Sequence, residues 1–559
     1  MSSYVVTILD TTGIQPYIFN SNRLRENIGA SYLVSQATGN LDSTTDDWVK
    51  QQLGKLGVPK NQLYKSVQES GAIAELVYAG GGNAMLLFQS MDYAKQFTRN
   101  LSQHILKNAP GINLVAAHKE FNWSESLYDV VQNLVDNELE QLKRAKIPSV
   151  PLLGLGVSAF CDSTQLVAID TSEEYVQADE QDIYLISRET QAKLKVVSSK
   201  RGELANKVLK QKFESILKEK KLEFPYRMDH LGRSRDESSY YAVVHADGNG
   251  MGKRFRDYGK EGMKLNLLDP NRGYINAMRR LSDSLNQAGL AAMTTVLKAV
   301  VDSIENEEVL GKFSIFTQKG NQYLPLRPLV YGGDDVTFIC DGRLGLELAA
   351  IYLKAFQEQS VADGKALSAC AGISIVKSHY PFARAYALSE ALCSNAKKFI
   401  WEQKKQWGEE KEFSAIDWHI AASGLFGSIG EIRQREYKVV EGSLTIRPII
   451  IQDEANQWRT WSNFTSIIKT FNESPDWKGR RNKVIALREK LREGAEATRQ
   501  FRKAYSIDKL PIIKGGDELA LQTSGWTEQR CGYFDAIEAM EFYFPLNQGE
   551  SGERVQTEN

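Results

Sequence analysis

The pattern of apolar and polar positions predicts strands alternating with helices. Residues 3–10 form a short apolar run typical of a buried strand, and residues 20–38 place apolar side chains at helical spacing. Two apolar runs broken by glycines over residues 73–90 indicate a β-hairpin. Three further elements are expected next: a helix over 91–107, a strand over 112–118, and an amphipathic helix over about 124–146.

The same order of elements recurs later in the chain. Residues 240–247 predict a strand that ends in Asp247, and residues 327–340 predict a second glycine-broken hairpin. The surrounding pattern predicts helices over 272–304, 344–359 and 381–400, and a strand over 368–376.

Spacing supports an internal repeat. Gly80 is 65 positions before Ala145, Gly332 is 64 positions before Ala396, and each alanine is followed by a lysine. Two copies of one βααββαβ-type unit, a ferredoxin-like palm, explain this match. The alternative is two unrelated α/β domains whose elements happen to follow the same order.

The fold class expected from these patterns is α+β. The length of 559 residues is enough for three or four domains. We expect a mainly helical C-terminal region with Trp461, Phe464, Ile467 and Ile468 on one helix face, and a disordered tail. The predicted domains are a first palm over 1–149, a connecting α/β domain over 150–235, a second palm over 236–405, and the C-terminal region over 406–559.

Composition and charge exclude several classes of protein. Lys and Arg total 69 against 70 Asp and Glu, so balanced charge argues against a polycationic nucleic-acid coat. No apolar stretch reaches the roughly 18 residues that a membrane helix needs, and the N-terminus lacks the basic region of a signal peptide. The five scattered cysteines indicate a reducing compartment, so we expect a cytoplasmic protein that does not associate with membranes.

The sharpest chemical motif is Gly332-Gly333-Asp334-Asp335, between two apolar strands. Glycines suit a tight turn or the close approach of a ligand, and adjacent carboxylates repel unless a cation neutralises them. The strand that ends in Asp247 occupies the position from which a carboxylate meets such a hairpin in palm polymerases and nucleotide cyclases. The motif therefore predicts a site for divalent cations and a nucleotide triphosphate. In the alternative interpretation, Asp247 caps a helix and the two hairpin aspartates form a solvated turn.

Several motifs together resemble the large, polymerase-like subunit of type III CRISPR effector complexes. The resemblance extends from residue 5 to about residue 545. It implies two palms, a connecting domain, a helical C-terminal domain, and synthesis of cyclic oligoadenylates from ATP. The motifs are Asp10–Ile18 with Gly29–Ser31, Gly80–Asn83, Ala246–Lys253, Tyr331–Asp335, and Ala371–Ile375 with Pro381 and Ala396–Lys398.

The resemblance also implies roles for individual residues. Asp247, Asp334 and Asp335 are expected to be catalytic and to hold Mg²⁺ or Mn²⁺, and Lys397 is expected to reach the triphosphate. Guide RNA and other effector subunits are implied as partners; the oligomeric state is left open. The remaining residues expected to contact nucleotide are Gly332, Gly333, Gly248, Asn249, Gly81, Gly82 and Asn83.

Three departures from the family pattern change these expectations. None of the six histidines is followed by Asp, so no HD nuclease site and no DNase activity are expected. Only Cys161 lies in the connecting region, so no zinc is expected. Asn249 stands where the family often has a second acidic residue, which weakens one metal ligand or leaves its role to Asp335.

The first palm is expected to be degenerate. Its hairpin carries Gly82 and Asn83 where the second palm has two aspartates, so it lacks the carboxylates for a two-metal site. Two palms facing one another would place one ATP on each side of a shared cleft. Two other functions stay open: a non-catalytic scaffold subunit of an RNA-guided complex, and a GTP-using enzyme similar to diguanylate cyclases.

Overall fold

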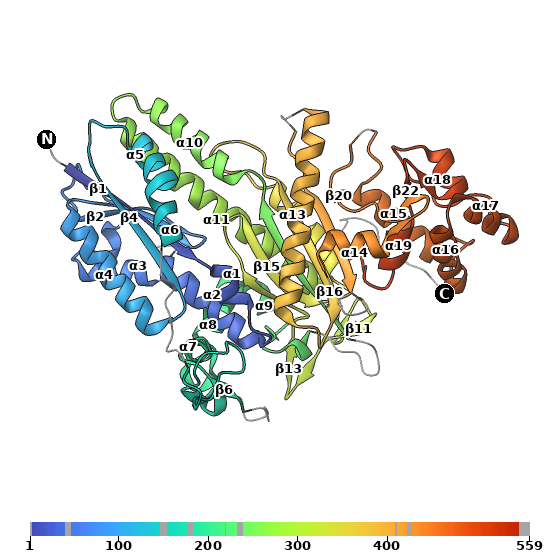
Figure 1. Cartoon of the computed structure of the whole chain (residues 1–559), viewed down its shortest axis with the longest axis horizontal. Helices are drawn as coiled ribbons and strands as arrows, with labels where there is room; N and C mark the ends of the chain where they lie inside the picture. Colours follow the sequence, from blue (N-terminus) through green and yellow to red (C-terminus); the bar gives the residue numbers. More distant parts are fainter. Residues whose placement is uncertain are drawn as a thin grey trace.

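The structure, a computed structural model, is built around two main β-sheets with covering helices, together with a connecting region and a C-terminal region (Figure 1). The N-terminal sheet and the C-terminal region lie at opposite ends of the longest axis, with the second sheet between them. The structure describes residues 3–39, 46–145, 154–175, 183–218, 220–231, 239–408, 411–421, 427–454 and 456–546.

The first palm is built on a four-stranded antiparallel sheet in the order β2-β3-β1-β4. This is the ferredoxin-like order that the sequence predicts. Apolar side chains of α2, α3 and α4 pack on one face of the sheet, and α5 with its continuation packs on the other. Its strands are β1 (Ser3–Thr12), β2 (Ala74–Gly80), β3 (Asn83–Phe88) and β4 (Asn113–Asn122). Its helices are α1 (Ile14–Phe19), α2 (Leu24–Thr38), α3 (Trp48–Lys55), α4 (Met91–Asn108), α5 (Leu127–Asn133), a π-helical turn over Leu134–Leu139, and α6 (Glu140–Ala145).

The second palm repeats this arrangement. Its strands follow the order β14-β15-β8-β16, which is the order of the first sheet element by element. Its strands are β8 (Tyr240–Gly248), β14 (Leu326–Val330), β15 (Asp335–Asp341) and β16 (Ala369–Lys377). Its helices are α10 (Met251–Leu265), α11 (Pro270–Asp302), α12 (Gly345–Gln357) and α13 (Phe382–Trp407).

A local feature after the first strand of each palm also repeats. Asp10 and Asp247 are each followed three residues later by a glycine that precedes a helix. These glycines, Gly13 and Gly250, have φ values of 69° and 68°, in the left-handed region that favours glycine. The matching strand order and the matching turn together confirm the internal repeat.

The C-terminal region differs from the mainly helical domain expected from residue 406 onward. Strand β17 (Ala415–Ala421) pairs in parallel with β16, and β20 (Ile449–Ile450) pairs with β17, so both extend the sheet of the second palm. A boundary at residue 405 therefore cuts through this sheet. The predicted tail lies outside the described residues.

The rest of the C-terminal region combines helices with a small sheet. Trp461, Phe464, Ile467 and Ile468 are buried on one face of α15, as the sequence predicts. The helices are α14 (Ile429–Glu436), α15 (Trp461–Glu473), α16 (Arg481–Glu493), α17 (Ala495–Ala504), α18 (Glu518–Ser524) and α19 (Phe534–Ala539). The small sheet has the order β18-β19-β22-β21, from Lys438–Val439, Gly442–Ser443, Arg530–Cys531 and Trp526–Thr527.

The connecting region packs against the first palm. Helix α7 comes so close to α2 that a Cβ on Gly29 would lie 2.0 Å from the backbone oxygen of Lys193. Cys161 is buried, and its Sγ lies 3.4 Å from Oγ1 of Thr190. Its elements are β5 (Asp170–Thr171), β6 (Leu185–Ile186), α7 (Arg188–Val197), α8 (Leu204–Lys212), α9 (Glu214–Leu217) and β7 (Leu222–Glu223). Five short strands between α11 and β14 are β9 (Ile304–Glu305), β10 (Glu308–Val309), β11 (Phe313–Ser314), β12 (Thr317–Gln318) and β13 (Asn321–Tyr323).

Helix α11 joins the two palms. It belongs to the second palm, but its N-terminal half packs on the first through Tyr274, Ile275 and Met278. Glu75 of β2, whose side chain is 0% exposed, accepts hydrogen bonds from Arg272 at 2.5 Å and Arg279 at 3.1 Å. A buried carboxylate is stable only when it is paired, so this contact sets how α11 lies on the first palm.

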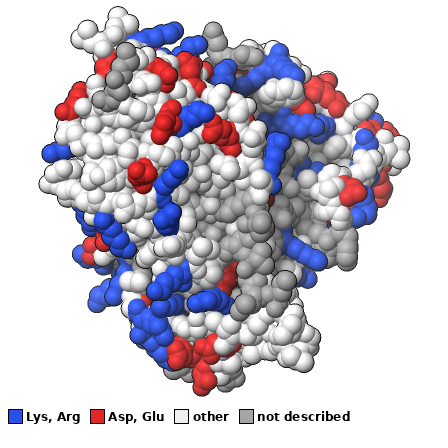
Figure 2. Space-filling view, turned by 60° about the vertical axis from the view of Figure 1, so that its left-hand side comes forward, with Lys and Arg blue, Asp and Glu red and all other residues white. Residues whose placement is uncertain are grey.

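Charged side chains are mixed on the molecular surface. Figure 2 shows Lys and Arg interspersed with Asp and Glu around a broad uncharged area of one face. Among the described residues, none of the helices has both the length and the apolar character needed to cross a bilayer.

Replacing Glu75 with Ala should lower the free energy of unfolding by about 3 kcal/mol, because two partly buried arginines lose their counter-charge. Denaturant unfolding of the whole chain measures this change. The control is Glu138→Ala, which removes a surface ion pair with Lys119 and should cost less than about 1 kcal/mol. Equal effects of the two substitutions would contradict a structural role for Glu75.

Candidate active site

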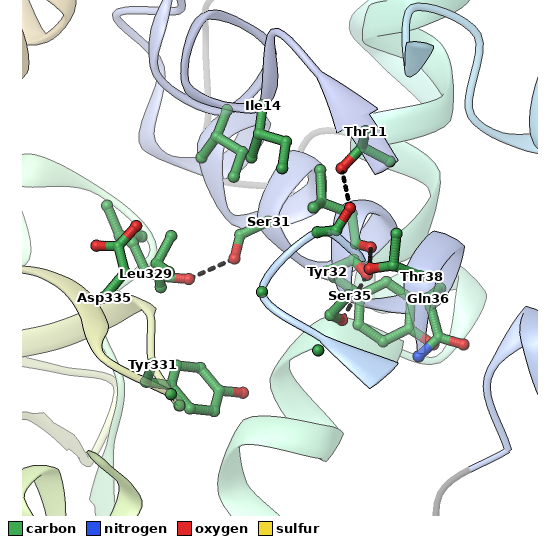
Figure 3. Close-up of a pocket in the computed structure, with 18 of the residues that line it drawn as sticks. Thr11, Ile14, Ser31, Tyr32, Ser35, Gln36, Thr38, Leu329, Tyr331 and Asp335 are labelled. Atoms are coloured by element: carbon green, nitrogen blue, oxygen red, sulfur yellow. Dashed lines mark hydrogen bonds between the residues drawn. The ribbon is translucent and has the colours of Figure 1, made fainter. Parts of the chain in front are cut away.

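A cavity of about 1060 Å³ lies between the two palms. Both hairpin turns line it: the glycine turn, Gly80–Asn83, and the acidic turn, Gly332–Asp335. Figure 3 shows Tyr331 and Asp335 on one side of this space, with Thr11 and the polar side chains of α2 on the other. We call this space the inter-palm cavity. It brings together the two turns that the sequence places at corresponding positions of the repeat.

The backbone of the acidic turn is shaped by glycine and by helix α11. Gly332 and Gly333 have φ values of 112° and 73°, which are unfavourable for other residues. Helix α11 lies against the turn at Gly289, where a Cβ would come within 2.3 Å of the carbonyl oxygen of Gly333. The side-chain oxygen of Asn286 on the same helix lies close to Gly332. Helix α11 therefore supports the turn that carries Asp334 and Asp335.

Three carboxylates meet at this turn. Asp335 begins β15 and is the direct cross-strand partner of Asp247 at the end of β8. The amide of Gly248 donates a hydrogen bond of 3.1 Å to the backbone oxygen of Asp334. A Cβ at Gly248 would lie 2.8 Å from Cβ of Asp334, so a glycine is needed for this approach. The repeat thus places Asp247, Asp334 and Asp335 side by side.

The crowding of carboxylates raises their proton affinity. Burial first, and then the charges of Asp247 and Asp334, raise the pKa of Asp335 to about 8. Burial and Asp247 also raise the pKa of Asp334. Solvent in the cavity still reaches 48% of the Asp335 side chain and screens part of this effect. Asp335 therefore resists ionisation until a cation compensates its charge.

Lys397 neutralises part of this charge. Its Nζ lies 2.5 Å from Oδ2 of Asp247 and donates to the backbone oxygen of Gly248 at 3.0 Å. Burial acts to lower the pKa of Lys397, but the charge of Asp247, the hydrogen bond to Asp247 and the nearby Cys393 and Cys370 together outweigh burial, and the pKa is raised. The lysine is therefore charged and held at the first-strand carboxylate.

The carboxylate oxygens of Asp247, Asp334 and Asp335 are suitable ligands for a hard divalent cation that also binds phosphate. Within the described parts of the chain, no three His, Cys, Asp or Glu side chains are arranged to hold a metal ion by themselves. Mg²⁺ in nucleotide-dependent enzymes is commonly held by one or two carboxylates together with substrate phosphates. Oδ1 of Asp335 is buried and has no hydrogen-bond partner among the described residues, so it is available for this role.

His245 is a neighbour that the sequence analysis did not single out. Its Nδ1 lies 3.1 Å from Oγ1 of Thr337 and 3.5 Å from Oδ1 of Asp335. Burial lowers the pKa of His245 to about 4, so the imidazole is neutral at physiological pH. The period of two along a strand places residue 245 on the same face as Asp247, which is the signal that could have identified it.

The side chain of Asn249 forms hydrogen bonds with other residues of the protein and does not line the inter-palm cavity. Its Nδ2 donates to Oγ of Ser368 at 3.0 Å and to the backbone oxygen of Phe413 at 3.1 Å. These bonds tie the segment after β8 to the residues just before β16 and β17. The side-chain amide of Asn249 therefore has a structural role in this chain.

The first palm keeps a carboxylate–lysine pair of its own. Lys143 Nζ lies 2.6 Å from Oδ2 of Asp10, and Lys397 Nζ lies 2.5 Å from Oδ2 of Asp247. The spacing of the repeat pairs Lys397 with Lys146, which lies outside the described residues. Burial raises the pKa of Asp10 although Lys143 acts in the opposite direction.

The glycine turn is tightly constrained. The backbone oxygen of Gly82 accepts bonds from N and Oγ1 of Thr11 at 2.9 and 2.7 Å. Gly82 has a φ of 88°, and a Cβ there would lie 2.2 Å from Cδ1 of Ile14. The turn thus lies against the start of α1 and carries no carboxylate.

The expected site residues occupy two places. Gly81, Gly82, Asn83, Gly332, Gly333, Asp334 and Asp335 line the inter-palm cavity. Gly248 and Lys397 lie behind the acidic turn, around Asp247. Three further sets of cavity-lining residues are not among those expected from the sequence: Tyr32, Val34, Ser35, Gln36 and Thr38 of α2, Gln211 and Lys212 of α8, and Ser282 and Asn286 of α11.

One family model matches the segment that forms the second palm. Residues 240–406 match the family described as Cas10/Cmr2, second palm domain. A search of curated protein sequences gave no significant match.

Several solved structures are similar to nearly the whole chain. A Csm1–Csm4 cassette in complex with cA3 is 11% identical with a TM-score of 0.47, over 97% of this chain and 69% of that one. A Csm1–Csm4 cassette with AMPPNP is 12% identical with a TM-score of 0.48, over 97% and 70%. Csm1 of T. onnurineus is 13% identical with a TM-score of 0.45, over 97% and 70%.

The segment that matches the family is also the segment that carries most of the acidic site. The matched residues contain β8, the acidic turn, β16 and α13, which supply Asp247, Asp334, Asp335 and Lys397. Over residues 240–406 the chain is accordingly similar to the second palm domain of the Cas10/Cmr2 family.

Proposed function

We propose that this chain is a nucleotidyltransferase of the type III CRISPR large-subunit kind, which joins ATP into cyclic oligoadenylates. The observation that carries the proposal is the acidic turn beside Asp247, at the wall of a cavity that the second palm shares with the first. Crowded carboxylates with raised pKa values are costly to keep unless they bind a cation. Their retention in a second palm of the Cas10/Cmr2 family supports an enzyme.

The proposed reaction is attack of a ribose 3′-hydroxyl on the α-phosphate of another ATP. A bond forms between the 3′-oxygen and the α-phosphorus, the α–β phosphoanhydride bond breaks, and pyrophosphate leaves. The hydroxyl proton passes to a carboxylate or to water. Asp247, Asp334 and Asp335 would hold Mg²⁺ or Mn²⁺, which supplies charge stabilisation when bound. Lys397, already beside Asp247, would add a positive charge near the phosphates.

The size and walls of the cavity support two nucleotides. Pockets for one small ligand usually measure about 300–1,000 Å³. The inter-palm cavity, at about 1060 Å³, lies at the upper end of this range and has one turn from each palm in its wall. We assign the reacting α-phosphate to the second palm, with its carboxylates, and the attacking nucleotide to the first.

A scaffold function is the second candidate. Asp247 is already neutralised by Lys397, and the described residues hold no three-ligand metal site without substrate. The resemblance implies guide RNA and effector subunits as partners in either case, and we propose that the chain acts with them.

Incubation of the purified chain with Mg²⁺ or Mn²⁺ and each labelled nucleoside triphosphate tests the proposal. Mass spectrometry of the products should show cyclic oligoadenylates with ATP. Products from GTP alone would favour an enzyme similar to diguanylate cyclases. Absence of product with every nucleotide, also in the presence of guide RNA, target RNA and partner subunits, would favour the scaffold.

Replacing Asp334 and Asp335 together with Ala should abolish product formation and leave the fold intact. Removing like charges from the turn relieves repulsion, so the metal-free protein should not lose stability. Asp247→Asn should have a similar effect on activity. Product yield and circular dichroism measure the two outcomes, and wild-type turnover in the double variant would exclude the metal assignment.

Asn83→Ala should leave most of the activity, because Asn83 is exposed and an amide is a weak ligand for a divalent cation. Gly82 is unsuitable for this test, since alanine there would collide with Ile14. Steady-state kinetics should show at most a raised KM for ATP. Loss of kcat comparable to that of Asp334→Ala would contradict the asymmetry of the two palms.

Replacing Asp334 and Asp335 together with Asn should stabilise the metal-free protein relative to the wild type. This gain in stability should grow as the pH rises from about 5 to 8. An unfolded Asp ionises near pH 4, whereas both folded groups have raised pKa values, that of Asp335 about 8. In this range the folded wild type binds more protons than the unfolded chain, so its stability falls with pH. Urea unfolding in EDTA at several pH values measures the difference. A constant difference would show that these carboxyls titrate normally.

A further inference from the structure

We propose that Tyr32 and Gln36 of helix α2 bind the base of a nucleotide in the first-palm half of the inter-palm cavity, and that Gln36 selects adenine. This inference rests on the proposed function, because it takes the cavity to be a nucleotide site. It assigns the choice of base to side chains of the first palm and leaves the metal and the phosphates to the acidic turn.

The α2 wall of the cavity is polar but uncharged. The residues of α2 that line the cavity include no charged side chain. Asp46, an acidic residue of the first palm that also lines the cavity, is paired with Lys60, 2.9 Å away. Figure 3 shows Tyr32 and Gln36 on the α2 side and Asp335 on the opposite side. A wall of this kind suits the uncharged part of a nucleotide, its base and ribose.

Helix α2 is fixed relative to the acidic turn by contacts with two other parts of the chain. Oγ of Ser31 donates a hydrogen bond to the backbone oxygen of Leu329, in the strand β14 that leads into the acidic turn (Figure 3). Gly29 packs directly against the backbone of Lys193 in the connecting region. The α2 wall is therefore held by both the second palm and the connecting region.

Tyr32 and Gln36 lie one helical turn apart on the same face of α2. Both side chains are half-buried, and both residues line the cavity. The neighbouring hydroxyl of Ser35 is engaged by the helix, since its Oγ donates to the backbone oxygen of Tyr32 at 2.8 Å. The amide of Gln36 forms no hydrogen bond with another described residue, so its donor and its acceptor are available to a ligand.

The two side chains suit the two kinds of contact by which proteins hold a base. An aromatic ring stacks on the flat face of any base. A carboxamide places one donor beside one acceptor, and adenine presents the complementary pair, its amino group next to a ring nitrogen. Guanine has two neighbouring donors, N1–H and its amino group, which match a carboxylate. We therefore expect Tyr32 to contribute affinity for any base and Gln36 to contribute the preference for adenine.

Gln15 of α1 is a competing amide. It lines the cavity and lies one turn from Phe19, as Gln36 does from Tyr32. The side chain of Phe19, however, is only 2% exposed, and its ring already stacks on Tyr386 with 3.8 Å between the ring centres. Tyr32 has no such ring contact within the described parts of the chain. The ring that is available for stacking is therefore the one beside Gln36.

The simpler explanation is that Tyr32 and Gln36 only border the cavity. In that case, replacing Gln36 changes the affinity for all nucleotides alike, through shape or charge. If Gln36 pairs with the base, the change depends on which base is offered. Removal of the amide then has no effect on inorganic triphosphate, which has no base.

Calorimetry of the full chain with non-hydrolysable analogues of ATP and GTP in Mg²⁺, and with inorganic triphosphate, separates these explanations. The wild type should prefer the ATP analogue, and Gln36→Glu should reduce this preference about tenfold, the discrimination expected for one paired contact to a base. Gln36→Leu, which removes the amide without adding a charge, should also reduce it and leave triphosphate binding unchanged. The matched control is Gln15→Glu, which adds the same charge to the cavity and should leave the preference unchanged.

Replacing Tyr32 tests the stacking contact. Tyr32→Ala should weaken binding of both analogues about tenfold, the loss expected for one stacked base, and should not affect triphosphate. Tyr32→Phe keeps the ring and should retain the affinity. Equal affinity of Tyr32→Ala and the wild type for the analogues would exclude a base at this position.

The remaining outcomes separate this inference from the proposed function. If both Gln36 variants keep the preference of the wild type, the role of Gln36 is wrong and the proposed function stands. The same holds if the wild type does not prefer the ATP analogue, or if Gln15→Glu lowers the preference as much as Gln36→Glu. If the wild type binds neither analogue nor triphosphate, both the proposed function and this inference fail. Circular dichroism of each variant excludes loss of fold as the cause.

Discussion

The approach of helix α11 to both palms is the contact on which the arrangement of the site depends. At one end, Arg272 and Arg279 are paired with the buried Glu75 of the first palm. Near its middle, Gly289 lies directly against the carbonyl of Gly333. One rigid helix therefore positions the acidic turn relative to the first palm, and the inter-palm cavity is formed between them.

Electrostatics gives this geometry its chemical character. Asp247, Asp334 and Asp335 are held together by strand pairing, and the pKa values of both turn aspartates are raised. Lys397 offsets one of the charges at 2.5 Å. The energy stored in this repulsion is available for binding a cation with nucleotide phosphates, which links the stability of the fold to its proposed activity.

Much of the fold could be predicted because its signals are local. Apolar runs broken by glycines identified both hairpins, and the repeat spacing identified the two palms. The same local reasoning placed Asp247 beside Asp335, because a ferredoxin-like order makes their strands neighbours.

The features that escaped prediction depend on contacts between distant segments. Residues 415–421 join the second palm by parallel pairing with β16, which no local pattern indicates. The pairing of Asp10 with Lys143 joins the first strand of the palm to a helix more than 130 residues later, and no local pattern indicates it. The hydrogen bond from Asn249 to Phe413 and the contact of Lys212 with Tyr331 likewise join residues that are far apart in the chain.

The most direct test of the account is a crystal structure of the chain with a non-hydrolysable ATP analogue and Mn²⁺, with anomalous scattering used to locate the metal. The account predicts a Mn²⁺ peak beside Asp247 and Asp335, triphosphate density between it and the inter-palm cavity, and no peak at Asp10. A metal bound at Asp10, or nucleotide bound only outside the inter-palm cavity, would contradict it.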